Sequence, residues 1–150
     1  MSAEAAERVV VLTMRFLAAS FAVVGTLFIA TPDGVIDVID DLGDAVGSFA
    51  TGAETEQKFW LALAFAYMVV ITGIALVVQS DVVRFRPLLL VLAAGKAASS
   101  LAALAFFVAD DDVFIYFLNF LVDGSLVLIS LWCWSLAGRV EAARPATAPG

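Results

Sequence analysis

The sequence contains no histidine and one cysteine, Cys133, among its 150 residues. The lack of histidine excludes histidine-ligated haem, metal centres built on histidine and catalytic triads that use it as the base. A lone cysteine cannot form an internal disulfide or a CxxC pair, and its apolar surroundings predict a packing role. GxSxG, P-loop and HExxH motifs are also missing. We therefore expect no enzyme activity, no metal site and no cofactor.

Charge is also scarce. Charged residues make up 15% of the chain and hydrophobic residues 63%. Soluble domains contain roughly 25% charged and about 45–50% apolar residues. The composition predicts an integral membrane protein of one domain whose main partner is the lipid bilayer. We expect no nucleic-acid partner for a chain with a net charge of −7.

Four long apolar stretches are present. A bilayer core of roughly 30 Å needs about 20 apolar residues per helix. The stretches that satisfy this length are residues 9–30, 59–78, 88–108 and 113–137. Short connections after the second and third stretches predict antiparallel neighbours. The predicted fold is an all-α, up-and-down four-helix transmembrane bundle with a flexible tail over 139–150.

The basic residues predict the orientation. Six of the eight would lie at one side of the membrane: Arg8, Arg15, Arg84, Arg86, Arg139 and Arg144. Lysine and arginine concentrate in cytoplasmic loops, whereas acidic residues contribute little to topology. We therefore expect a multi-pass protein of the cell membrane with both termini in the cytoplasm.

The connection between the first two stretches has its own helical periodicity. Its apolar residues recur at helical spacing: Val35, Val38, Ile39, Leu42, Val46 and Phe49. Asp37, Asp41, Asp44 and Ser48 fall on the opposite face. This pattern predicts an amphipathic helix over about 34–49 on the outer face. It either covers the outer end of the bundle as a lid or serves as a docking surface for a cationic or protein partner.

The outer side is predicted to be acidic. The carboxylates expected there include Asp37, Asp40, Asp41, Asp44, Asp110, Asp111 and Asp112. The run of residues 110–112 predicts a solvated turn in which one aspartate caps the fourth helix. A cation site is the alternative, although the alternating ligands and distal glutamate of a calcium loop are missing.

One carboxylate, Asp123, lies inside the fourth apolar stretch. It is ten residues past the start, which places it roughly 15 Å deep. An aspartate there costs about 2.5–3.5 kcal/mol on insertion scales, so it is expected to face the bundle interior and to have a partner. Lys96, inside the third stretch, is close enough in depth, and we predict a buried Lys96–Asp123 ion pair.

Other polar residues share the predicted faces of these two helices. The spacing places Asn119 and Ser130 beside Asp123, and Ser99 and Ser100 beside Lys96. Small residues also repeat every four positions in the third stretch, as Gly95, Ser99 and Ala103 and as Ala94, Ala98 and Ala102. Such rows permit close helix approach. Arg15 either joins this polar network or extends its side chain to the inner headgroups.

The ion pair has two interpretations. It holds the helices in register, alone or completed by another subunit, or it has a functional role as a proton or cation relay or as the counter-charge of a substrate. The sequence has no complete conducting path and no paired broken helices. We therefore predict an accessory or assembly subunit that works as a homo-oligomer or within a larger membrane complex. The alternative is a small transporter or channel that uses Lys96, Asp123 and Asn119.

The chain also resembles the small four-span bacterial membrane proteins of the DoxX-like kind. The residues that carry the resemblance are Arg15-Phe16-Leu17, Gly25, Pro32 and Arg86-Pro87-Leu88. The resemblance implies a four-helix architecture and an accessory function in a membrane complex. It implies no active-site residue.

Overall fold

The computed structural model describes residues 1–50, 58–109 and 112–144. Within these ranges the chain forms α1 (Ala3–Ala30), α2 (Pro32–Val46), α3 (Lys58–Ser80), α4 (Pro87–Ala109) and α5 (Phe114–Ala143). Four of these helices, α1, α3, α4 and α5, are long and apolar enough to cross a membrane. The protein is therefore an all-helical bundle in which each predicted apolar stretch forms a helix.

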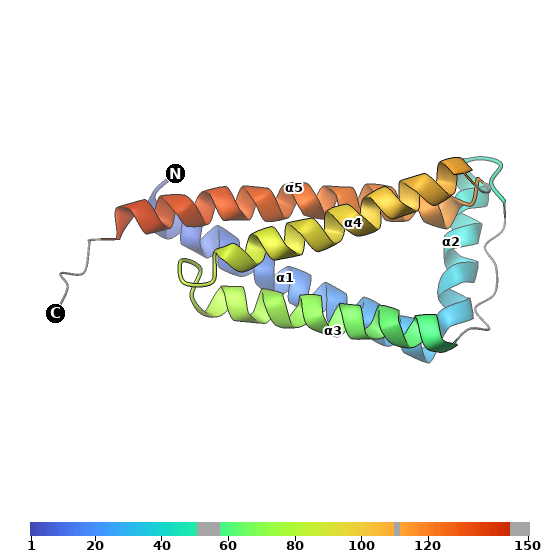
Figure 1. Ribbon diagram of the computed structural model, residues 1–150, viewed down its shortest axis with the longest axis horizontal. Helices are drawn as coiled ribbons and strands as arrows, with labels where there is room; N and C mark the ends of the chain where they lie inside the picture. Colours follow the sequence, from blue (N-terminus) through green and yellow to red (C-terminus); the bar gives the residue numbers. More distant parts are fainter. Residues whose placement is uncertain (51–57, 110–111, 145–150) are drawn as a thin grey trace.

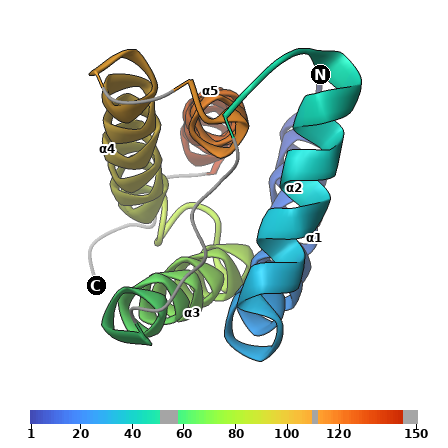
Figure 2. The same cartoon turned by 90° about the vertical axis from the view of Figure 1, so that its right-hand side faces the viewer.

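The four long helices run up and down in two closely packed pairs. α1 packs along α3, α4 packs along α5, and the pairs meet mainly where α1 contacts α5. The N-terminus, the α3–α4 connection and the end of α5 share one end of the bundle (Figure 1). We call this the terminal end and the other the α2 end, because α2 lies across it, transverse to the long helices (Figures 1 and 2).

The two middle spans differ from the sequence prediction. α3 and α4 are antiparallel and joined by a short connection, but they touch each other far less than α3 touches α1. Gly25 helps to explain this preference, because a Cβ there would lie only 2.8 Å from the Cβ of Met68 on α3. The absent side chain allows α1 and α3 to approach closely. α3 and α4, although consecutive among the four long helices, therefore pack less closely than α1 and α3.

The apolar core lies mainly toward the terminal end. On α1 its residues follow one helical face, for example Val10, Met14, Leu17 and Phe21. They pack with Ile71 and Val78 of α3, Leu89 and Leu92 of α4, and Cys133, Leu136 and Val140 of α5. Large apolar side chains are also exposed on the outer faces of the bundle. Examples are Phe16, Val70, Leu101 and Leu128.

The first and last helices of the chain, α1 and α5, extend beyond the predicted stretches. α1 begins at Ala3, where the hydroxyl of Ser2 accepts a hydrogen bond of 3.2 Å from the backbone N–H of Ala5. α5 continues to Ala143. The prediction of a flexible tail over 139–150 is therefore wrong for residues 139–143, which are helical. The helix ends at Ala143, and Arg144, the residue before a proline, is extended, because the proline ring disfavours helical backbone at the preceding position. Residues 145–150 lie outside the described part.

The connection between α1 and α3 does contain a helix, α2, but over Pro32–Val46 rather than 34–49. Proline is favoured at the first helical position, which explains the earlier start. Gly43 packs against Phe114 at the start of α5, whereas Val38, Leu42 and Val46 are exposed. The residues assigned to one apolar face are therefore not all turned to the bundle.

The start of α5 also departs from the prediction. The residue before the helix is Val113, which has no polar side chain, so no aspartate caps this helix. The backbone carbonyl of Asp112 instead accepts a 3.2 Å hydrogen bond from the N–H of Ala50. This contact, together with the Phe49–Phe114 ring pair at 4.9 Å, fixes the chain after α2 against the beginning of α5.

Candidate functional site

The centre of the candidate site is an ion pair between α4 and α5. The Nζ of Lys96 lies 2.9 Å from Oδ1 of Asp123, and the side chains are only 3% and 6% exposed. Each residue lies nine positions after the start of its helix, or about 14 Å along it at about 1.5 Å per residue. Because the helices run in opposite directions, the two side chains meet near the middle of the bundle.

Two aromatic rings complete the surroundings of Lys96. Its Nζ lies 5.0 Å from the ring centre of Phe21 on α1 and 5.3 Å from that of Tyr67 on α3. Both distances lie within the range in which a ring face attracts a cation. The site therefore draws one residue from each of the four long helices. Neither ring was predicted, because nothing in their local sequence distinguishes Phe21 or Tyr67 from other apolar residues of these spans.

The electrostatic balance of this arrangement explains how the charges are tolerated. An isolated charge in a low-dielectric interior is very costly, and an ion pair reduces that cost only when its geometry is good. Here the ammonium faces one carboxylate oxygen at hydrogen-bond distance and the faces of two rings. The local net charge is zero, and neither partner is exposed to the surroundings.

Further polar contacts join α4 to α5 beside the ion pair. The hydroxyl of Ser100 donates to the backbone carbonyl of Phe120 at 2.9 Å, and Nδ2 of Asn119 donates to Oγ of Ser99 at 3.3 Å. Gly124 lies opposite Ser100, whose Oγ would be 3.3 Å from an added Cβ. The structure thus brings Lys96, Asp123, Asn119, Ser99 and Ser100 together along one interface.

Two residues predicted beside this site lie apart from it. The hydroxyl of Ser130 is buried and donates to the carbonyl of Leu126 in its own helix, at 2.7 Å. Arg15 is exposed, and its Nε donates to Oε1 of Gln79 on α3 at 3.1 Å. Arg15 therefore links α1 to α3 nearer the terminal end and makes no contact with the Lys96–Asp123 pair.

The hydroxyl of Tyr67 is unusual among the described residues. It is buried and has no hydrogen-bond partner there. It lies against Gly95, where an added Cβ would be 3.1 Å from the oxygen. A buried hydroxyl without a partner loses its hydration without compensation. This group is the natural place in the site for a further polar contact.

The predicted acidic surface is only partly described. Asp37, Asp41 and Asp44 are exposed on α2, Asp40 is half-buried, and Asp112 is exposed before α5. Asp110 and Asp111 lie outside the described residues. In the part of the chain that the structure covers, no three acidic, cysteine or histidine side chains are grouped so that they could hold a metal ion.

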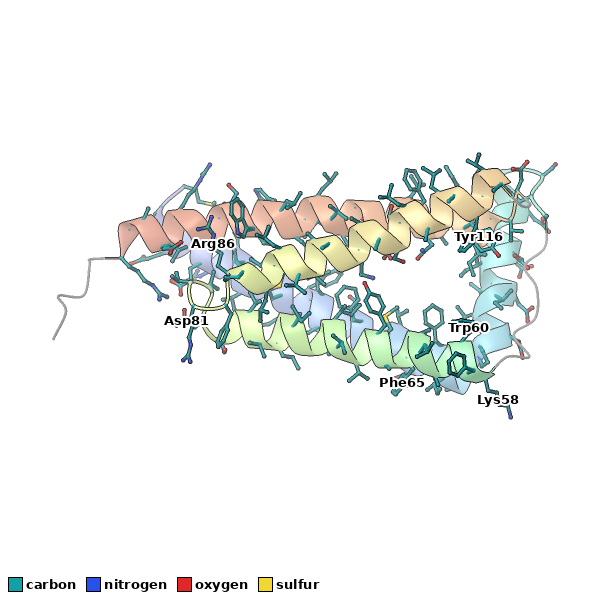
Figure 3. The ribbon with its side chains drawn as sticks, viewed as in Figure 1. Lys58, Trp60, Phe65, Asp81, Arg86 and Tyr116 are labelled. Atoms are coloured by element: carbon teal, nitrogen blue, oxygen red, sulfur yellow. The ribbon has the colours of Figure 1, made fainter. Side chains whose placement is uncertain are left out.

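A second polar cluster at the terminal end was not predicted. Nη1 of Arg86 lies 2.7 Å from Oε2 of Glu141, its Nε donates to the carbonyl of Trp134 at 3.1 Å, and its Cζ lies 4.2 Å from the Trp134 ring centre. Figure 3 shows Arg86 where the beginning of α4 meets α5, with Asp81 in the connection below it. The only sequence signal was Arg86 beside Pro87, which entered the sequence analysis through the topology and the family resemblance and was not assigned to a site.

A neighbouring set of ion pairs lies at the same end of the bundle. Arg144 lies 3.3 Å from Asp81 and 3.5 Å from Glu7, and so connects α5 to the α3–α4 connection and to α1. The backbone N–H of Arg84 donates to Oδ1 of Asp81 at 3.1 Å and holds the pKa of that carboxyl below its usual value. The charge of Arg144 acts in the same direction.

The fold and site define an all-helical bundle with four potential membrane spans and a buried lysine–aspartate pair at its centre. Comparison with models of protein families, with curated proteins and with solved structures finds no match for this chain.

Proposed function

We propose that the protein is a small multi-pass membrane protein that acts as an accessory or assembly subunit, as a homo-oligomer or within a larger complex. It would lie in the cell membrane with both termini in the cytoplasm. The concentration of all six arginines toward the terminal end supports this orientation through the positive-inside rule. The DoxX-like resemblance points to the same kind of role.

The observation that carries the proposal is the enclosure of the Lys96–Asp123 pair. A transport site must exchange its ion or proton with water, whereas these side chains are 3% and 6% exposed and are packed among residues of four helices. A buried pair of fixed geometry suits a different task, because it penalises every helix register in which the charges fail to meet. We infer that the pair holds α4 and α5 in one register.

Two surfaces are available for a partner. α4 carries two rows of small residues. The row of Gly95, Ser99 and Ala103 faces the bundle, since Ala103 is buried and Ser99 accepts a hydrogen bond from Asn119. The row of Ala94, Ala98 and Ala102 is exposed. An exposed row of small residues lets another transmembrane helix approach closely. On α2 the exposed Val38, Leu42 and Val46 lie among exposed carboxylates, and an apolar patch with a polar rim is typical of a protein-binding surface.

Crosslinking tests the proposal. Ala98→Cys, in a Cys133→Ala background, is expected to give disulfide-linked dimers in native membranes or a crosslink to a neighbouring subunit. Leu128→Cys is the matched control, because residue 128 is also exposed but belongs to α5. Native mass spectrometry in lipid nanodiscs supplies the second measurement. A lone monomer in the nanodiscs, together with no crosslinked product in membranes, would overturn the proposal.

One observation favours the transport alternative. The ring of Tyr67 faces Lys96, and its hydroxyl, which has no partner among the described residues, could exchange a hydrogen bond with a passing ligand. That alternative predicts ion or proton flux in proteoliposomes that Asp123→Asn abolishes while the helical circular dichroism spectrum is retained. Absence of flux for the wild-type chain with protons and with alkali cations disposes of it.

A further inference from the structure

The arginine cluster at the terminal end lines a cavity of about 310 Å³, formed by Val83, Arg84, Arg86, Pro87, Leu90, Trp134 and Glu141. Its volume lies at the lower end of the roughly 300–1,000 Å³ typical of small-molecule sites. The cavity belongs to the α3–α4 connection, the first turn of α4 and the last part of α5. It is therefore separate from the Lys96–Asp123 pair.

One arginine of this cavity is held rigidly. Arg86 is fixed by Glu141, by the carbonyl of Trp134 and by the face of the Trp134 ring. Gly138 makes room for it, because a Cβ there would be only 2.7 Å from Nη2 of Arg86. A guanidinium that is already ordered loses little conformational freedom when it contacts a ligand.

The other arginine has no acidic partner among the described residues. Arg84 is exposed, and its guanidinium lies 5.2 Å from the ring centre of Phe85. No carboxylate among the described residues forms an ion pair with it, whereas Glu141 is engaged by Arg86. Among the residues that line the cavity, the charges of Arg84, Arg86 and Glu141 therefore sum to one positive charge, which a single phosphodiester would neutralise. The nearby carboxylate of Asp81 is paired with Arg144.

The remaining walls are apolar. Leu90 is 42% exposed and lies one turn further along α4, toward the middle of the bundle. Trp134 and Pro87 complete a surface on which a hydrocarbon chain can lie. Tryptophan is enriched at the membrane interface, where one side of a site is polar and the other is lipid. A basic pocket between transmembrane helices on the cytoplasmic side is also the setting in which anionic headgroups bind.

We propose that this cavity binds the phosphodiester of an anionic glycerophospholipid. Arg84 contacts the phosphate, Arg86 supplies a fixed second cation, and the first acyl carbons lie along Trp134 and Leu90. The inference rests on the membrane location proposed above, not on the assembly role. The cavity is expected to prefer phosphatidylglycerol to phosphatidylcholine. The choline group of phosphatidylcholine carries a positive charge, so binding of that lipid would leave the positive charge of the cavity unbalanced.

Tryptophan quenching tests the proposal, since brominated acyl chains quench a tryptophan only at close range. The reporter is the full chain with Trp60→Phe and Trp132→Phe, which leaves Trp134 in the cavity wall. Nanodiscs contain phosphatidylcholine with increasing fractions of dibrominated phosphatidylglycerol or dibrominated phosphatidylcholine. We expect the brominated phosphatidylglycerol to quench Trp134 at about fivefold lower fraction, the factor that one arginine at an anionic surface contributes.

Arg84→Gln should remove that preference, and Arg139→Gln should retain it. Arg139 is an exposed arginine at the same end that does not line the cavity, so it controls for general surface charge. Equal quenching by the two lipids, or a preference that survives Arg84→Gln, would overturn the proposal. Inorganic phosphate is added as a further probe. If it changes Trp134 emission in discs of phosphatidylcholine alone and abolishes the lipid preference, the ligand is free phosphate and the lipid proposal is overturned.

A second reporter separates this inference from the proposed membrane location. With Trp60→Phe and Trp134→Phe, the remaining Trp132 is 52% exposed and does not line the cavity. Equal quenching of Trp132 by both brominated lipids shows that the chain lies in the bilayer, so a failure at Trp134 then counts against the lipid site alone. No quenching of Trp132 by either lipid counts against the membrane location itself.

Discussion

Gly25 on α1 lies directly against Met68 on α3, and an added Cβ would be 2.8 Å from the Cβ of Met68. This relationship places the backbones of α1 and α3 closer than any side chain at position 25 permits. The second pair, α4 and α5, is joined differently, by hydrogen bonds and an ion pair. The bundle thus uses steric fit on one side and polar contacts on the other.

Gly25→Ala tests the steric side. The added methyl group must displace Met68 or separate the helices, and overpacking of this kind costs about 1–3 kcal/mol. We expect a lower thermal unfolding temperature, followed by circular dichroism in detergent. Gly73→Ala is the control, since its added Cβ would have no atom within 4 Å apart from its chain neighbours and the nearby backbone of its own helix, and there alanine should be neutral or stabilising. Equal effects at the two positions would contradict the close approach.

The ion pair should show strong coupling. Lys96→Met leaves a buried carboxylate without its cation, a change that costs about 3–5 kcal/mol in protein interiors. The double change Lys96→Met with Asp123→Asn removes both charges and should recover much of that loss. Unfolding of Lys96→Met, Asp123→Asn and the double variant in mixed detergent micelles gives the coupling energy as the effect of the double variant minus the sum of the two single effects. Additive effects would mean that the two charges do not depend on each other.

The two hydroxyl groups near the pair should behave differently. Tyr67→Phe removes a buried group without a described partner, so unfolding stability should be unchanged or slightly raised. Ser100→Ala removes the bond to the carbonyl of Phe120 and should cost about 0.5–1.5 kcal/mol. Measurement of both by the same thermal unfolding assay checks the contrast. A marked loss for Tyr67→Phe would reveal a partner for that hydroxyl.

Acid should weaken the terminal end through Asp81. Its pKa is lower in the folded chain than the ordinary aspartate value of about 3.9, so ionised Asp81 favours the folded state. That contribution is complete above the ordinary value and is lost as the pH falls through the lower folded value. The difference in unfolding temperature between wild type and Asp81→Asn should therefore be constant at neutral pH and shrink below about pH 4. A difference that stays constant down to low pH would exclude the effect.

The sequence predicted most of the architecture because its signals are local. The apolar runs identify four helices, whereas the starts of α2 at Pro32 and of α4 at Pro87 lie before the predicted bounds of 34 and 88, since proline suits the first helical turn. It also suggested that Lys96 and Asp123 pair, because each is costly alone at that depth. The errors arose where distant parts of the chain meet: Glu141, among the helical residues 139–143, pairs with Arg86, and the carbonyl of Asp112, before α5, accepts a hydrogen bond from Ala50.

The composition and the hydrophobic pattern by themselves determined that this chain forms long apolar helices, with one lysine and one aspartate at depths close enough for an extended lysine side chain to reach the carboxylate. Only the tertiary structure decided that Phe21 and Tyr67 face Lys96, that α3 packs on α1 rather than on α4, and that Arg86 meets Trp134 and Glu141. Helix formation depends on backbone hydrogen bonds between residues four apart, which the local sequence controls. The choice of neighbours depends on side-chain fit between helices far apart in the sequence, and for residues such as Phe21 and Tyr67 no local pattern reveals it.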